Sequence, residues 1–66
     1  MVSDQPTRKA VKMLQSAGWQ RLRTVGSHSI WRSPKGDTFT LPDGHRRISP
    51  GVYRNLLKAL EAANDN

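Results

Sequence analysis

Two amphipathic segments, one near each end of the chain, constrain the fold most, because each carries an apolar stripe that must be buried. In the first segment, residues 7–17, the apolar positions recur at helical spacing: Ala10, Val11, Leu14 and Ala17. Gly18 follows, and glycine is favoured after a helix because it adopts a positive φ without a Cβ clash. The pattern predicts a helix that ends just before Gly18.

The second amphipathic segment opens with clear helix-start chemistry. Ser49 suits the N-cap, and Pro50 suits the first helical position, where its missing N–H costs nothing. We expect Ile48 to pack on Tyr53 as a hydrophobic staple. An apolar stripe follows with spacing i, i+3, i+4, i+7, and we interpret it as core: Tyr53, Leu56, Leu57 and Leu60.

Three short strands are predicted between the helices, over residues 19–24, 28–33 and 37–41. A Val-Gly break separates the first two, and a Ser-Pro-Lys-Gly-Asp turn separates the last two. The third alternates, with Phe39 and Leu41 on one face, and Pro42 ends it because proline cannot donate to a strand ladder. The short connections favour an antiparallel meander.

The predicted element order is therefore α-β-β-β-α, in the α+β class. Both helices need a common apolar surface, which one face of a three-stranded antiparallel sheet supplies, while the other face stays open to solvent. This is the architecture of a double-stranded-RNA-binding-like domain. We expect residues 1–66 to form a single domain, with frayed ends at residues 1–6 and 63–66. Without cysteine, packing alone must hold it.

The charge of the chain is strongly basic, with 11 Lys and Arg against 5 Asp and Glu, a net charge of +6. Such a surface attracts polyanions, so nucleic acid is the first partner to consider and an acidic protein the second. Two histidines with no cysteine do not predict a metal site, and we expect no cofactor. No stretch reads as a membrane span or a signal peptide, which favours the cytoplasm and no membrane partner.

Several features occur together in a fixed order: a helix ending in Gly-Trp, a basic strand, Gly-Ser-His, a hairpin, a strand ending in Pro, a nearby His, and Pro-Gly opening the last helix. In this order, from Arg8 to Leu60, the chain closely resembles the HicA toxins, small mRNA interferases that pair with a HicB antitoxin. Two departures are visible: Val52 stands where the family usually has threonine, and Asp43-Gly44 forms an extra turn before His45.

The resemblance implies a double-stranded-RNA-binding-like fold and an endoribonuclease that cleaves mRNA independently of the ribosome. It places the catalytic histidine at His28 and the preceding turn at Gly26 and Ser27. The implied partners are single-stranded mRNA and a HicB-like antitoxin, with the chain a monomer when free or part of a hetero-oligomer with the antitoxin.

The residues themselves suit metal-independent RNA cleavage. RNA supplies its own nucleophile, the 2′-OH, and a histidine can move the proton because imidazole titrates near neutral pH. Gly26 permits a close backbone approach, and Ser27 can orient the imidazole or a phosphate oxygen. Basic side chains can hold phosphates and offset developing charge. We assign RNA binding to Arg21, Arg23, Arg32, His45, Arg46 and Arg47, with His45 read as a basic contact rather than a catalytic group.

Strand parity limits where His28 points. His28, Ile30 and Arg32 share one sheet face, and Ser29 and Trp31 share the other. We expect Ile30 to face the helices, which leaves Trp31 free to stack a base and His28 at the rim of the helix-covered face. In the alternative, Trp31 is core and His28 lies on the open face. Trp19 is interpreted as core.

Two other functions fit the same fold and charge. One is a non-catalytic RNA-binding module, which does not need His28. The other is an interaction protein whose basic face docks an acidic partner.

Overall fold

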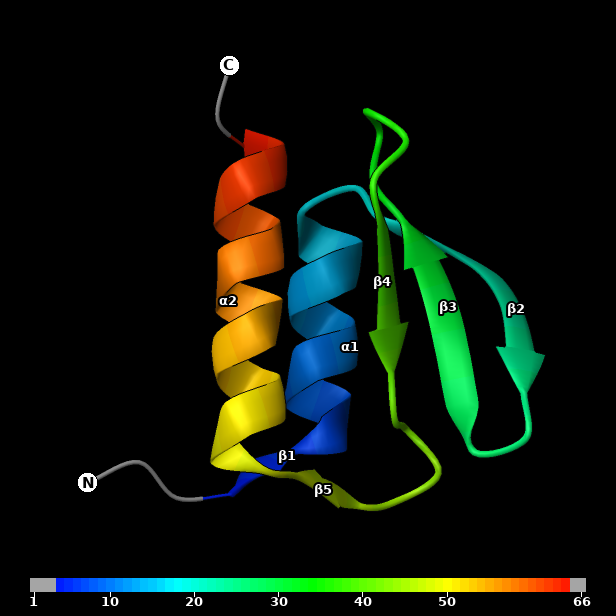
Figure 1. The fold of residues 1–66 in the computed structure, drawn as a ribbon, viewed down its shortest axis with the longest axis vertical. Helices are drawn as coiled ribbons and strands as arrows, with labels where there is room; N and C mark the ends of the chain where they lie inside the picture. Colours follow the sequence, from blue (N-terminus) through cyan, green and yellow to red (C-terminus); the bar gives the residue numbers. More distant parts are fainter. Residues whose placement is uncertain (1–3, 65–66) are drawn as a thin grey trace.

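The computed structural model describes residues 4–64 of the chain (Figure 1). Its elements in order are β1 (Gln5–Pro6), α1 (Thr7–Ser16), β2 (Gln20–Val25), β3 (His28–Arg32), β4 (Thr38–Leu41), β5 (Arg47–Ile48) and α2 (Pro50–Asn64). The strands β2, β3 and β4 form an antiparallel sheet in sequence order. The predicted α+β architecture, with helix, three-stranded meander and helix, is confirmed.

The molecule has two layers. In Figure 1 the two helices lie side by side, β4 lies next to them, and β2 forms the far edge of the sheet. The Cα atoms extend over 30 × 29 × 16 Å, and the short third dimension is the thickness of one helical layer on one sheet. Every residue of β2 is exposed, so this strand projects beyond the cover of the helices.

The core fills the space between the layers with one cluster of buried side chains. These are Ala10, Leu14, Trp19, Trp31, Leu41, Ile48 and Leu56. The prediction that Trp19 is core is confirmed, since only 3% of it is exposed. Non-directional burial of this apolar area is the main stabilising term for a chain of this size.

The apolar side of α2 differs from the predicted stripe at one position. Leu57, expected in the core, is 41% exposed, whereas its neighbour Leu56 is fully buried. Successive helical residues are about 100° apart, so only one of two adjacent leucines can point straight at the sheet. The core-facing side of the helix consists of Val52, Tyr53, Leu56, Ala59, Leu60 and Ala63.

The two helices begin in different ways. The Val52 N–H donates to Ser49 Oγ at 3.3 Å, which confirms Ser49 as the N-cap of α2. The residue before α1 is Pro6, which supplies no side-chain cap. Instead, the Thr7 N–H donates to the carbonyl of Arg46 at 2.8 Å, so a distant loop satisfies the first donor of α1.

Four positions within the predicted frayed ends lie in regular elements. Gln5 and Pro6 form β1 and pair with β5, where Gln5 is opposite Ile48, and α2 continues through Ala63 and Asn64. The partner of β1 lies about forty residues away in the chain, and no local pattern in a two-residue strand indicates such a pairing. Of the other residues in the predicted frayed ends, Asp4 is exposed and belongs to no helix or strand, and residues 1–3 and 65–66 lie outside the described residues.

The adjacent leucines of α2 provide a test of the packing. Leu56→Ala is expected to reduce the free energy of unfolding by about 2–5 kcal/mol, because it leaves a cavity in a core with little room to collapse. Leu57→Ala, matched in chemistry and helix position, is expected to cost less than about 1 kcal/mol. Urea unfolding followed by circular dichroism measures both; equal losses would contradict the core described here.

Candidate active site

The face of the sheet that carries His28 is decided by Trp31. Trp31 is 2% exposed and Ser29 is fully buried, so both lie under the helices, opposite the buried or half-buried Leu41 and Phe39 of β4. The expectation that Ile30 faces the helices and Trp31 the solvent is therefore wrong. The larger indole fills the space between the layers, and Ile30 is only half-buried.

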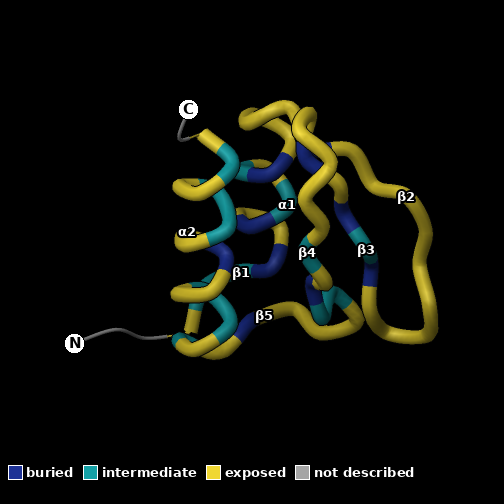
Figure 2. Tube along the Cα trace, turned by 45° about the horizontal axis from the view of Figure 1, so that its top comes forward, coloured by how far each residue is buried: buried dark blue, intermediate teal, exposed yellow. Residues whose placement is uncertain are grey.

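His28 consequently lies on the open face of the sheet. Directly opposite it on β2 is Val25, and opposite Ile30 is Arg23. Arg32 lies on the same face of β3, because side chains two and four residues along a strand point the same way. Figure 2 shows β2 exposed along its whole length, while β3 alternates between exposed and buried positions.

A tight turn delivers His28 to this face. Val25 pairs with His28, so the hairpin loop contains only Gly26 and Ser27. Gly26 has a φ of 59°, and glycine at the first position of a two-residue loop is typical of a type II′ turn. A Cβ at Gly26 would meet nothing within 4 Å. The turn therefore needs glycine for its backbone angle and leaves open space around it.

One nitrogen of the His28 imidazole, Nδ1, is in contact with the neighbouring side chain of Ser27. Ser27 Oγ and His28 Nδ1 lie 3.3 Å apart and form a hydrogen bond whose donor depends on the tautomer of the ring. This contact can orient the ring, and it does not involve Nε2. The exposed side chain can accept or donate a proton there, as general acid–base chemistry requires.

A β-bulge in β2 separates two arginines that simple alternation would place together. Arg21 is opposite Trp31, yet Arg23 is opposite Ile30, because the register shifts between them and Leu22 is the extra residue. Arg21 therefore belongs to the helix-covered side and Arg23 to the open face. The predicted pair of RNA-binding arginines on this strand is split.

Arg21 joins a polar cluster that we call the Asp43 cluster: Arg21, Ser29, Trp31 and Asp43. The guanidinium of Arg21 lies 5.1 Å from the Trp31 ring centroid, and its Nη2 is 3.5 Å from Asp43 Oδ2. Trp31 Nε1 donates to Ser29 Oγ at 2.9 Å, and Ser29 Oγ donates to Asp43 Oδ2 at 2.6 Å. The buried serine thus ties the loop after β4 to the middle of β3.

Gly44 and His45, the two residues after Asp43, also form hydrogen bonds with distant segments of the chain. The Gly44 N–H donates to the carbonyl of Ser27 at 2.8 Å. A Cβ at Gly44 would overlap the Ser27 Cβ and lie 2.9 Å from its Cα, so only glycine allows this approach. The carbonyl of His45 accepts from Thr7 Oγ1 at 2.6 Å. The loop is therefore fixed against both α1 and the turn that carries His28.

The three other residues predicted to bind RNA, His45, Arg46 and Arg47, lie in or next to the loop after β4. His45 lies next in the chain to Gly44, and so close to the turn at Ser27, with its side chain exposed. Arg46 is exposed on the same loop, while Arg47 belongs to β5 and its Nη2 donates to the Asp4 carbonyl at 2.7 Å. These three residues form a second basic segment, separate from Arg23 and Arg32.

Sequence reasoning missed Ser29, Asp43 and Gly44. The Asp-Gly pair was visible as an extra turn, but nothing local indicated that its carboxylate reaches a serine fourteen positions away. Within residues 4–64, no three side chains of His, Cys, Asp or Glu gather as metal ligands would.

A scan against models of protein families matches residues 7–62 to the HicA toxin of bacterial toxin–antitoxin systems. The chain belongs to this family. It is a HicA toxin, and such a toxin is paired with an antitoxin. Comparisons with curated proteins and with solved structures gave no match. Between residues 4 and 64 of this toxin, neither helix has the length and apolar character that crossing a membrane requires.

The close contact at Gly44 gives a prediction about the site. Gly44→Ala is expected to destabilise the toxin by about 1–3 kcal/mol and to move the amide NMR signals of Ser27 and His28, because the added Cβ forces the loop away from the turn. Gly51→Ala is the matched control, since a Cβ there meets nothing nearer than Ser49 Oγ at 3.9 Å. It is expected to be neutral or stabilising by up to about 1 kcal/mol. Unchanged Ser27 and His28 signals in Gly44→Ala would contradict the close contact.

Proposed function

We propose that this toxin is a metal-independent endoribonuclease that cleaves mRNA, with His28 as its general acid or base. The observation that carries the proposal is the placement of His28: it is exposed on the open face, held through Nδ1 by Ser27, and shares that face with Arg23 and Arg32. A purely structural strand-end histidine would not need a neighbouring hydroxyl to orient it.

The reaction needs little more than this arrangement. Attack by the 2′-OH on the adjacent phosphorus forms one P–O bond and breaks another. A proton leaves the 2′-OH, and a proton must reach the departing 5′ oxygen. His28 Nε2 takes part in one of these transfers, and Gly26 and Ser27 support it by setting the position and orientation of the ring. Because the nucleophile belongs to the RNA, no metal-bound water is required.

The arginines of the open face bind the strand. Arg23 is opposite Ile30, two positions along the strands from the His28–Val25 pair and on the same face, so it holds the phosphate nearest to the reacting one. Arg32 lies four residues from His28, about 13 Å along β3, and contacts a phosphate further along the RNA. Val25 and Ile30 offer aliphatic surface beside His28 in place of the base stacking that was expected of Trp31.

The other basic residues have different tasks. Arg21 belongs to the Asp43 cluster, where its guanidinium pairs with Asp43 and helps to hold the loop after β4. His45, Arg46 and Arg47 extend the basic surface past the turn and contact the RNA backbone. Such contacts carry little sequence information, so the toxin binds many mRNAs with similar affinity. Its antitoxin, of the HicB type, covers the open face and His28, and both act in the cytoplasm, where mRNA is found.

The first test replaces the histidine. His28→Ala is expected to reduce RNA cleavage at least about a hundredfold and to abolish growth inhibition. The variant lacks the imidazole that transfers the proton, while RNA binding remains. His45→Ala is the matched control and is expected to retain cleavage within a few fold. Gel-resolved cleavage of a short single-stranded RNA in excess EDTA measures both, and a thermal transition by circular dichroism checks the fold.

Three results would count against the proposal. Cleavage by His28→Ala at the wild-type rate would leave a non-catalytic RNA-binding module or an acidic-protein dock as the better function. Loss of the thermal transition together with activity would make the histidine structural. Loss of wild-type cleavage in EDTA, with recovery on adding magnesium, would exclude the metal-independent mechanism.

The second test separates RNA positioning from chemistry. Arg23→Gln with Arg32→Gln is expected to weaken RNA binding across sequences and to flatten the log–log salt dependence by about 1.4, since each phosphate contact on a single strand contributes about 0.7. Arg8→Gln with Arg54→Gln removes the same charge from the helices and is expected to leave the slope unchanged. Fluorescence anisotropy over a salt series measures the slope; equal slopes for both double variants would remove the open face from the RNA footprint.

A further inference from the structure

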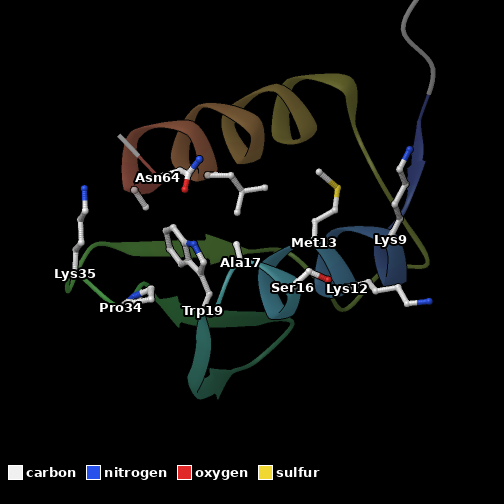
Figure 3. Close-up of a pocket in the computed structure, with 11 residues that line it drawn as sticks. Lys9, Lys12, Met13, Ser16, Ala17, Trp19, Pro34, Lys35 and Asn64 are labelled. Atoms are coloured by element: carbon white, nitrogen blue, oxygen red, sulfur yellow. The ribbon is translucent and has the colours of Figure 1, made fainter. Parts of the chain in front are cut away.

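A groove of about 750 Å³ lies on the helix side of the molecule, on the opposite face of the sheet from His28 (Figure 3). Its apolar lining includes Met13 of α1, Ala17 just after that helix, Trp19, and Leu60 and Ala63 of α2. In Figure 3 the lining residues of α1 run from Lys9 to Ser16, Trp19 lies beneath the end of α2, and Pro34 with Lys35 closes the far side. None of the residues proposed for RNA cleavage lines it.

The groove has basic side chains in its lining. Lys9, Lys12 and Lys35 line it, and among the lining residues that the structure describes none is Asp or Glu. Lys9 also contacts Gln5 and lies over the Tyr53 ring, 5.4 Å from its centroid, which holds this ammonium group beside the groove. An occupant that suits the lining must therefore combine apolar groups with negative charge.

The indole nitrogen of Trp19 is a second, independent observation that points to an occupant of the groove. Its Nε1 is buried and has no hydrogen-bond partner among the described residues, although the side chain lines the groove and is only 3% exposed. A buried donor left unpaired costs about 1–3 kcal/mol. The other tryptophan shows the usual arrangement, because Trp31 Nε1 donates to Ser29 Oγ. An acceptor that reaches Trp19 Nε1 would remove this penalty.

Two other occupants fit the lining poorly. A second copy of this chain carries a net charge of +6 and would bring repulsion to a surface that is already basic. Single-stranded RNA binds through exposed aromatic faces and arginines, but the only aromatic ring among the lining residues is the buried Trp19 ring, and all its cations are lysines.

We propose that this groove docks an acidic amphipathic segment of a partner protein. Apolar side chains of the segment pack on Met13 and Leu60, its carboxylates pair with Lys9 and Lys12, and one of its oxygens accepts from Trp19 Nε1. That nitrogen is covered in the free chain, so the side chains around it move apart on binding. The proposal does not depend on RNA cleavage, and it gives the toxin a protein-binding surface separate from its open face.

The two tryptophan side chains provide the readout. The probe is a synthetic amphipathic helix of about 18 residues with leucines at i, i+3, i+4 and i+7 and glutamates on its other face. In ¹H–¹⁵N spectra of the intact chain, this peptide is expected to shift the Trp19 indole signal and leave the Trp31 indole signal in place. The same peptide with lysine for glutamate is expected to cause no shift at equal concentration.

Matched charge reversals locate the contact. Lys12→Glu is expected to weaken peptide binding about three- to tenfold, because it places a carboxylate in the groove. Lys58→Glu, the same change at an exposed site of α2 outside the lining, is expected to leave the affinity unchanged. Equal effects of both variants, or no shift of the Trp19 signal by the acidic peptide, would overturn the proposal.

The alternative occupants give distinct outcomes. A Trp19 shift that depends on the concentration of the chain alone would identify a second copy. A Trp19 shift produced by a short single-stranded RNA, with displacement of the peptide, would identify an RNA groove. Either result would overturn the assignment to an acidic protein segment and would leave the role of His28 untouched.

Discussion

The burial of Trp31 under the two helices sets the orientation of everything else in the sheet. Strand residues alternate between faces, so once this indole is inside, its neighbours Ile30 and Arg32 must point outward, and so must His28 three positions earlier. Burying a large aromatic ring outweighs the exposure of half an isoleucine. A packing preference in the core thereby places the imidazole of His28 on the solvent side, on the same face as Arg23 and Arg32.

The turn that carries His28 owes its position to contacts from outside its own hairpin. The loop after β4 makes three such contacts. Asp43 accepts from Ser29, the Gly44 N–H donates to the carbonyl of Ser27, and the carbonyl of His45 accepts from Thr7. Each is a hydrogen bond between segments far apart in the chain. A small domain without cysteine thus uses a single loop to connect the turn at Gly26 and Ser27, the sheet and the first helix, and these contacts restrain a site that lies at an edge.

Local chemistry in the sequence was sufficient to predict most of the elements. The helix stop at Gly18, the cap at Ser49 and the end of β4 at Pro42 all follow from the backbone limits of single residues, and the structure agrees with them. The resemblance to HicA toxins came from the order of such features, and the family match agrees with it.

The features that were not predicted are of two kinds. Some depend on which of two adjacent apolar residues is buried, and others on contacts between segments far apart in the chain. Ile30 and Trp31 are adjacent apolar residues, and which of them is buried is decided by the volume between the layers. Leu56 and Leu57 pose the same choice on a helix. The bulge at Leu22 and the contact between Ser29 and Asp43 arise only when separate segments meet. No periodicity in a single sequence contains that information.

The bulge in β2 also changes the exposed edge of the sheet. β2 is an edge strand with every side chain exposed, so its outer backbone groups are available to another strand. A regular edge would be a template for sheet extension between copies. The irregularity at Leu22 breaks the spacing of those groups, and Arg21 and Arg23 on either side of it add repulsion between identical edges. The same residue that sends the two arginines to opposite faces thereby also makes the edge of the sheet a less regular template for another strand.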